Sequence, residues 1–356
     1  MNLKKITTPT TFQKLVLTWF DSHGRKDLPW QHDKTPYRVW ISEIMLQQTQ
    51  VVTVIPYFQR FIARFPDVQS LAFAKEDDVL HLWTGLGYYN RARNLHRTAK
   101  SIAENFQGKF PADLEELQSL PGIGRSTAGA ILAIAFQQRA AILDGNVKRV
   151  LTRFHAIKEW SGEKNTAAAL WEITEKLTPN NRVADYTQAM MDMGATVCIR
   201  GKPHCDICPL QKLCLARQLG IEKTLPRAKP KKILPIRQAT LLILQNANCV
   251  LLEKRPPVGI WGGLWSLPEI INFTDEDAIH AVCRQRFQIQ SNTVKLDEPF
   301  RHTFSHFHLD ILPALVTLKT KPRKIMDSEQ RIWYNLQQSQ EVGLPAPVKK
   351  LLRNLS

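Results

Sequence analysis

The spacing of hydrophobic residues divides the chain into two parts of different character. Over roughly the first 220 residues, apolar side chains recur every three or four positions, as on one face of an amphipathic helix. Segments that show this pattern are 12–20, 39–61, 79–95, 127–135 and 167–177. Breaks containing proline or glycine separate them, such as Gly85-Leu86-Gly87 and Leu120-Pro121-Gly122. The pattern predicts a helical domain.

The rest of the chain reads as strands. Residues 222–237 hold three prolines and six Lys or Arg residues, which is typical of a linker. Residues 239–244 and 250–253 then resemble two strands joined by a turn at 246–248, and 308–312 with 314–318 resemble a second pair. We therefore predict a helical domain over 1–221, a basic linker over 222–237 and a small α/β domain over 238–356.

Composition adds a class of partner. In 356 residues, Lys and Arg exceed Asp and Glu by 48 to 32, a net charge of +16. Such a surplus favours a polyanion, and nucleic acid over a membrane surface because no basic amphipathic helix stands out. A basic protein without a polyanionic partner is the alternative. No apolar run reaches the roughly 18 residues of a membrane helix, and the N-terminal apolar patch is too short for a secretion signal. We expect a cytoplasmic protein with reduced thiols.

Four cysteines lie within one short loop, CIRGKPHCDICPLQKLC. They are Cys198, Cys205, Cys208 and Cys214. Four thiolates so close in the chain can converge on one metal centre, and the spacing leaves zinc and an iron–sulfur cluster both open. Disulfides are the alternative, which a reducing compartment disfavours. Arg200, Lys202 and Lys212 in the same loop could face phosphates.

The stretch LPGIGRSTAGA, residues 120–130, combines a glycine turn with a helix start. Gly122 and Gly124 let the backbone approach a phosphate closely, and the helix beginning at Arg125 directs N–H groups toward it. The alternative is an ordinary packing corner between two helices. The sequence leaves both interpretations open.

Two carboxylates lie in contrasting local sequences. Glu43 lies in the apolar stretch VWISEIML, where burial would raise its pKa toward that of a general acid at neutral pH. Asp144, in ILDGNVKRVL, precedes a helix whose N-terminus favours the anion. Carboxylates shifted in opposite directions suit cleavage of a glycosidic bond. A surface glutamate and a simple helix cap are the alternatives.

These motifs together resemble a known family. Gln47-Gln48-Thr49, Gly85-Leu86-Gly87-Tyr88-Tyr89, the glycine hairpin, LDGNVKRVL and the four-cysteine loop follow one another in a fixed order. In this order they resemble the helix–hairpin–helix DNA glycosylases, in the branch that removes adenine mispaired with 8-oxoguanine or guanine. The resemblance extends over nearly the whole chain. It implies an all-α glycosylase domain with an iron–sulfur loop, followed by a Nudix-like α/β domain that recognises 8-oxoguanine.

The resemblance also implies roles for individual residues. The four cysteines would hold one [4Fe–4S] cluster. Glu43 would protonate adenine N7 once the base is flipped out, Asp144 would stabilise the sugar cation, and Asn146 would assist it. The implied adenine pocket consists of Trp30, Leu46, Gln188 and Met191, the implied DNA wedge of Gln48 and Tyr88, and the implied 8-oxoguanine contacts of Thr49, Leu86, Phe304, Ser305 and His306, with Gly259 near DNA.

Two departures from related enzymes narrow the expected activity. Ser126 occupies the position of the catalytic lysine in relatives that also nick DNA, so the resemblance implies a monofunctional glycosylase without efficient lyase activity. Lys148 is not expected to replace that lysine. Glu269 lacks the acidic companions of a Nudix box, so no nucleotide or magnesium cofactor is expected. We expect a monomer acting on duplex DNA with A:8-oxoguanine or A:G mispairs. An endonuclease III-like lyase and a catalytically inactive DNA-binding protein are the rival interpretations.

Overall fold

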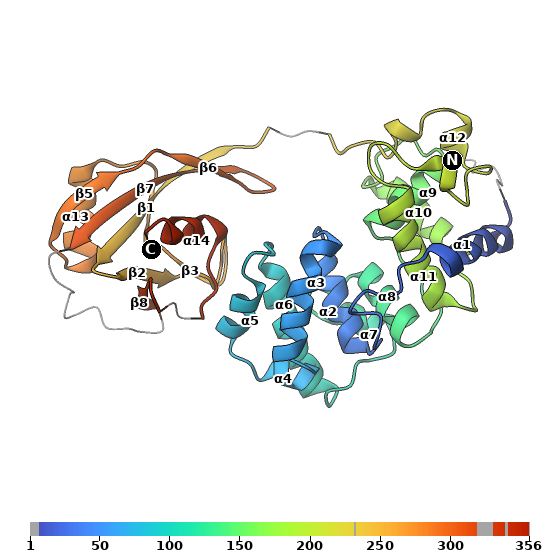
Figure 1. Ribbon diagram of the computed structural model, residues 1–356, viewed down its shortest axis with the longest axis horizontal. Helices are drawn as coiled ribbons and strands as arrows, with labels where there is room; N and C mark the ends of the chain where they lie inside the picture. Colours follow the sequence, from blue (N-terminus) through green and yellow to red (C-terminus); the bar gives the residue numbers. More distant parts are fainter. Residues whose placement is uncertain (1–6, 231–232, 319–329, 339–340, 356) are drawn as a thin grey trace. The chain divides into compact units, whose positions relative to one another are not determined.

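Figure 1 shows the chain as a computed structural model, which describes residues 7–230, 233–318, 330–338 and 341–355. The chain packs into two compact units: Met1–Phe73 with Asn94–Lys231, and Ala74–Arg93 with Lys232–Ser356. The predicted succession of a helical part and an α/β part is confirmed. Positions 231–232 of the predicted linker lie outside the described residues. Within the described ranges, no helix is long and apolar enough to span a bilayer.

The first unit is helical. Its helices are α1 (Pro9–His23), α2 (Pro36–Leu46), α3 (Val51–Arg64), α4 (Val68–Ala72), α7 (Leu114–Ser119), α8 (Arg125–Ala135), α9 (Gly145–Phe154), α10 (Lys164–Leu177), α11 (Val183–Asp192) and α12 (Leu215–Gln218), with the π-helical turn η1 (Met193–Val197) and the 3₁₀ turns η2 (Cys205–Ile207) and η3 (Glu222–Thr224). Helix α6 (Asn90–Asn105) begins in the second unit and continues into the first.

The segment 39–61, which the periodicity predicts as one helical stretch, is two helices. Helix α2 ends at Leu46 and α3 begins at Val51. Between them Gln48 has a φ of 58°, in the left-handed region that a helix cannot contain. Hydrophobic periodicity does not reveal this break, because residues 47–50 are too few to interrupt the apolar pattern of the two helices.

One hydrophobic core holds α1, α9, α10 and α11 together. Phe12 of α1 meets Phe154 of α9 edge to face, with ring centroids 5.0 Å apart. Both rings are almost fully buried, as are Leu151 and Leu170. Each such side chain contributes about 1.5–3 kcal/mol through burial, so this core fixes the position of α9, which Asp144 precedes.

The second unit is built on a mixed sheet. Its strands are β1 (Ile236–Asn246), β2 (Cys249–Lys254), β3 (Trp265–Ser266), β4 (Glu269–Ile271), β5 (Ser291–Leu296), β6 (Phe300–Thr303), β7 (His308–Leu318) and β8 (Arg331–Asn335), and its helices are α5 (Glu76–Trp83), α13 (Glu276–Phe287) and α14 (Ala346–Arg353). The main path runs β3-β2-β1-β7-β5, with β4 on β1, β6 on β7 and β8 on β2. Only β1 and β7 pair in parallel among these strands.

The predicted strands 308–312 and 314–318 are one strand, β7. Pro313 lies inside it, opposite Leu241 of the parallel β1, and its carbonyl accepts a hydrogen bond of 3.0 Å from the Asp297 backbone N–H. The expectation of two separate strands is wrong because the proline keeps the extended backbone of a strand. Figure 1 shows β6 and β7 projecting beyond the rest of the sheet as a hairpin.

Residues 74–93 pack with the second unit although they lie within the first half of the sequence. Asp77 of α5 pairs with Lys254 at 2.9 Å, the Tyr89 hydroxyl donates to the Leu344 carbonyl at 2.9 Å, and an Arg93 N–H donates to the Pro257 carbonyl at 2.7 Å. The linear pattern contains no sign of this grouping. The predicted domain limits remain predictions.

Candidate active site

Glu43 lies in α2 between buried apolar neighbours. Ile41, Ile44 and Met45 are each at most 3% exposed, and Glu43 is only half-buried. Burial of the carboxyl, and then the charge of Asp144, raise the pKa of Glu43 to about 8. No described residue donates a hydrogen bond to this carboxyl. Glu43 is therefore protonated at neutral pH and can act as an acid.

Asp144 is the N-cap of α9. Its carboxylate accepts hydrogen bonds from the Val147 backbone N–H at 2.7 Å and from Asn146 Nδ2 at 3.1 Å. Burial raises the pKa of Asp144 above its usual value, although these hydrogen bonds partly offset the shift. The expectation that its pKa is shifted opposite to that of Glu43 is thus wrong, because burial outweighs the helix N-terminus.

The two carboxyls still differ in what surrounds them. The charge of Asp144 contributes to the raised pKa of Glu43, so an ionised Asp144 disfavours ionisation of Glu43. Asp144 has two hydrogen-bond donors and the Arg149 cation nearby, whereas Glu43 has neither. These contacts favour the proton on Glu43 and the negative charge on Asp144. Such surroundings suit a proton donor at Glu43 and an anionic stabiliser at Asp144, and these roles remain predictions.

Helices α8 and α10 position the backbone that leads to Asp144. A Cβ on Gly129 of α8 would lie 2.3 Å from the Ala141 carbonyl oxygen, so only glycine allows this approach. Ser126 Oγ accepts the Leu143 N–H at 3.1 Å, and the Thr174 hydroxyl donates to the Ile142 carbonyl at 2.9 Å. Ser126 thus supports the strand-like segment before Asp144.

Arg149 connects the active-site amide with the cysteine loop. This arginine is 7% exposed and donates to Asn146 Oδ1 at 2.8 Å and to the Cys198 carbonyl at 2.6 Å. It also donates to the Gly194 carbonyl. Sequence reasoning missed it. Its one signal is an arginine among apolar positions of a helix, five residues after Asp144.

The four cysteines line a single cavity. All are free thiols, and Arg153 donates to Cys198 Sγ at 3.3 Å. Burial, and to a lesser extent the charges of the other three thiols, raise the pKa of Cys208 to about 12. In the described residues no three His, Cys, Asp or Glu side chains are arranged for a single metal ion. Four thiols that line one cavity are the donor set that a zinc ion or an iron–sulfur cluster uses.

The residues predicted to surround adenine come from three segments of the first unit. Trp30 is 6% exposed and meets Phe58 edge to face at 5.5 Å. Leu46 lies three positions after Glu43 on α2, and Gln188 and Met191 lie three positions apart on α11, so each pair shares one helix face. Leu46, Gln188 and Met191 are all half-buried.

Both predicted wedge residues have unusual backbones. Gln48 and Tyr88 have φ angles of 58° and 51°, which are rare for residues other than glycine. Each lies in a corner after a helix, and Tyr88 is 51% exposed. Of their predicted companions, Thr49 is half-buried beside Gln48, whereas Leu86 is buried. Strained, exposed corners are typical of functional loops.

The predicted phosphate hairpin forms a turn before α8. Gly122 has a φ of 80°, and a Cβ there would lie 2.8 Å from Asn94 Cβ, so the turn requires glycine. Gly124 caps α8 and no side chain bonds to the free N–H groups of that end. Arg125 points elsewhere: it pairs with Glu175 and stacks on Trp171 of α10 at 4.1 Å.

The predicted 8-oxoguanine motif forms the tip of the β6–β7 hairpin. Ser305 and His306 are exposed, with Ser305 Oγ 3.4 Å from His306 Nδ1. Phe304 stacks on Phe307, with ring centroids 4.7 Å apart. Aromatic packing thus supports an exposed polar tip. Gly259 has a φ of 98° and open space where a side chain would be.

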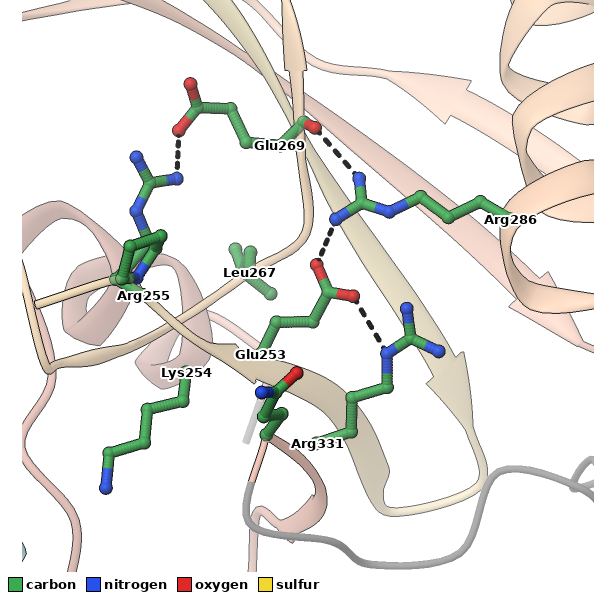
Figure 2. A pocket seen from close by; sticks show the side chains of 9 residues that line it. Glu253, Lys254, Arg255, Leu267, Glu269, Arg286 and Arg331 are labelled. Carbon is green, nitrogen blue, oxygen red and sulfur yellow. Dashed lines mark hydrogen bonds and ion pairs between the residues drawn. The ribbon is translucent and has the colours of Figure 1, made fainter.

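Glu269 lies in a pocket of about 620 Å³ in the second unit, shown in Figure 2. The carboxylates that line this pocket form ion pairs with arginines. Arg255 pairs with Glu269. Arg286 and Arg331 both pair with Glu253. A Nudix magnesium site needs carboxylates available to the metal. That this domain takes no magnesium remains a prediction.

Two family models match the chain. The model described as "HhH-GPD superfamily base excision DNA repair protein" covers residues 41–176, and the "NUDIX domain" model covers 239–354. Among curated proteins, the adenine DNA glycosylase of Buchnera aphidicola subsp. Acyrthosiphon pisum (strain APS) is 44% identical over 347 residues, covering 98% of each chain.

Solved structures match the helical part. A thermostable thymine-DNA glycosylase covers 59% of this chain and 97% of its own at 28% identity, with a TM-score of 0.54. A non-covalent endonuclease III–DNA complex covers 61% of this chain and 100% of its own at 22% identity, with a TM-score of 0.51. These matches confirm the predicted fold class, a helix–hairpin–helix glycosylase domain followed by a Nudix-like domain.

Proposed function

Because the chain belongs to the adenine DNA glycosylase family, we propose that it removes adenine mispaired with 8-oxoguanine or guanine from duplex DNA. The observation that carries this proposal is the carboxyl pair. Glu43, with its pKa raised to about 8, retains a proton, and hydrogen bonds from Asn146 and Val147 favour the anion of Asp144. Such a pair is what hydrolysis of an N-glycosidic bond requires.

The reaction uses the two carboxyls in sequence. An adenine flipped out of the duplex accepts the Glu43 proton on N7. The C1′–N9 bond then breaks, and its electron pair leaves with the neutral base. The carboxylate of Asp144 stabilises the oxocarbenium-like sugar, and water adds to C1′ and releases a proton. Asn146, held by Arg149, keeps the Asp144 carboxylate in position.

The enzyme is a monofunctional glycosylase without efficient lyase activity. A lyase needs an amine that forms a Schiff base at C1′. Ser126 has only a hydroxyl, and that hydroxyl already accepts the Leu143 N–H. Residue 126 therefore supports Asp144 instead of attacking the sugar.

The four cysteines, free thiols around one cavity, would hold one [4Fe–4S] cluster, and ligation by all four would tie the loop together. Arg200, Lys202 and Lys212 are exposed on the same loop and contact the DNA backbone. Iron and acid-labile sulfide in the purified protein would support this assignment, and stoichiometric zinc would contradict it.

Recognition of the lesion is shared between the two halves of the chain. Gln48 and Tyr88 insert into the base stack, and Thr49 and Leu86 lie near the opposing base. Ser305 and the adjacent side chains at the hairpin tip read 8-oxoguanine. The Gly122–Gly124 turn contacts phosphate through backbone N–H groups. The protein acts as a monomer on duplex DNA in the cytoplasm, at the nucleoid if the cell is bacterial; the fold it shares with endonuclease III, solved with DNA, agrees with such a substrate.

A panel of duplexes tests the proposal. Single-turnover reactions with A:8-oxoguanine, A:G, A:C and A:T pairs are followed by alkali, which breaks the strand where a base is missing. We expect alkali-dependent breaks at adenine opposite 8-oxoguanine or guanine. Absence of such breaks would refute the function. Efficient borohydride trapping on oxidised-pyrimidine DNA would instead favour an endonuclease III-like lyase.

A further inference from the structure

Asp192, the last residue of α11, is a fully buried carboxylate that the reaction above does not use. Its side chain is 0% exposed. Arg25 contacts it three times: the backbone N–H donates to Oδ2 at 2.8 Å, and Nε and Nη2 donate to Oδ1 at 3.0 and 2.6 Å. A buried carboxylate needs such compensation. Arg25 therefore holds the Asp192 carboxylate in one orientation.

A fourth donor reaches the same carboxylate. Gln188, one helical turn earlier on α11, places Nε2 2.9 Å from Asp192 Oδ1. A carboxylate only accepts hydrogen bonds, so the amide must turn its nitrogen, not its oxygen, toward Asp192. The orientation of this amide thus follows from the chemistry of its partner. Gln188 Oε1 faces away and accepts no hydrogen bond from any described residue.

A fixed amide oxygen selects what it can bind. The Gln188 Oε1 atom accepts a hydrogen bond from an amino group. A carbonyl oxygen in the same place would repel Oε1, because both atoms are hydrogen-bond acceptors. Adenine carries a 6-amino donor, whereas hypoxanthine and guanine carry a 6-oxo acceptor. A base without the amino group would leave Oε1 without a hydrogen bond, and the cost of that unpaired oxygen makes the site discriminate strongly against such a base.

We propose that Asp192, held by Arg25, is a specificity-determining positioning residue that fixes the Gln188 amide with its oxygen toward the base. The inference rests on the proposed function, because it takes Gln188 as part of the adenine pocket. Asp192 itself need not touch the base. Asp192 excludes the Gln188 orientation in which the amide nitrogen would point toward the base. The site therefore selects a purine that carries a 6-amino group.

The contact with Arg25 also ties the segment after α1 to α11, so a purely structural role must be distinguished. Duplexes with adenine, purine or hypoxanthine opposite 8-oxoguanine provide the readout, as single-turnover rates. The variants are Asp192→Asn, whose amide can donate as well as accept, and Asp192→Glu, which only accepts. Gln188→Met, alone and combined with Asp192→Asn, removes the amide that Asp192 positions.

We expect Asp192→Asn to lower the adenine-to-hypoxanthine rate ratio about tenfold or more, and Asp192→Glu to retain most of it. In the Gln188→Met background, Asp192→Asn should leave the ratio unchanged. An equal fall of all rates in Asp192→Asn, with the ratio preserved, would overturn the inference and leave only a structural role.

The wild-type protein gives a second test that needs no variant to fold. After division by non-enzymatic depurination rates, hypoxanthine should react more slowly than purine, because its oxygen opposes a fixed Oε1. Equal values would mean that the amide turns freely, and the inference would fail. If the wild type removed no mispaired adenine at all, the proposed function itself would fail, which is a distinguishable outcome.

Discussion

At the scale of single residues, the active site depends on a glutamic acid that keeps its proton at a pH where a glutamate in water would have lost it. Glu43 lies among apolar neighbours on its helix. Burial of its carboxyl, together with the charge of Asp144, raises its pKa from 4.5 to about 8. Asp144, with its hydrogen-bond donors, remains the anion. The environment, not the residue type, assigns the two roles.

The raised pKa of Glu43 predicts the pH dependence of base excision. Only the protonated acid can donate, so the single-turnover rate on A:8-oxoguanine should fall as the pH rises through about 8. Glu43→Gln should lower the rate by roughly 10²-fold or more and remove this alkaline limb. A rate independent of pH between 7 and about 9 would contradict the assignment of Glu43 as the acid.

The same shift predicts a stability cost. The unfolded chain releases the Glu43 proton near pH 4.5, the folded chain only near pH 8, so folding stability falls across that window and the full penalty applies above it. Glu43→Gln should therefore stabilise the protein by roughly 2–5 kcal/mol above pH 8 and by little below pH 4.5. Chemical denaturation at both extremes measures the difference. A pH-independent effect would contradict it.

Ser305 should control discrimination more than catalysis. Its hydroxyl is exposed at the hairpin tip, outside the unit that holds the carboxyl pair. Ser305→Ala should reduce the preference for A:8-oxoguanine over A:G about tenfold, because one hydrogen bond to the lesion is lost. Thr303→Ala removes a hydroxyl from the neighbouring strand and is the matched control. Equal loss on both substrates would count against this role.

At the scale of elements, close backbone packing positions the catalytic groups. The π-helical turn η1 passes so near the start of α9 that a Cβ on Gly194 would lie 2.5 Å from Asn146 Cβ and 2.9 Å from its Cα. Arg149 then joins the two elements by donating to Asn146 and to the Gly194 carbonyl. The turn that leads into the four-cysteine loop is thus packed directly behind the active site.

A single methyl group tests this packing. Gly194→Ala should displace the start of α9, destabilise the protein by about 1–3 kcal/mol and slow excision, because backbone atoms cannot move aside locally. Gly145→Ala is the matched control, since a Cβ there meets nothing within 4 Å. Thermal unfolding and single-turnover rates measure both effects. Similar stability of the two variants would contradict the packing argument.

At the scale of the whole molecule, charge governs encounter with the substrate. Lys and Arg outnumber Asp and Glu by 48 to 32, so cations would remain even if every carboxylate were paired with one. A polyanion partner releases counterions when such cations bind it.

Binding to duplex DNA should therefore weaken steeply with salt. A plot of log affinity against log salt concentration should be linear with a slope well below −1, as several phosphates are neutralised together. Fluorescence anisotropy with an undamaged duplex measures the non-specific part, and a mispaired duplex the specific part. A flat titration with either duplex would contradict the role of the basic surface.

The amino-acid sequence by itself determined the features that depend on near neighbours. Each of these features depends on residues close together in the chain: helical periodicity, the glycine turns, the cap at Asp144 and the spacing of the four cysteines. The order of the motifs along the chain identified the family. The charge surplus likewise needs no fold. Local physics fails only where a regular pattern hides a break, as at Gln48, or suggests one that is absent, as at Pro313.

Only the tertiary structure decided the rest, because it depends on residues far apart in the chain. The pKa of Glu43 is set partly by Asp144, about a hundred positions away, and burial overrides the helix end at Asp144 itself. Arg25 and Asp192 are 167 positions apart, yet their contact orients Gln188. Desolvation and long-range hydrogen bonds exist only once the chain has folded, so no local pattern can encode them.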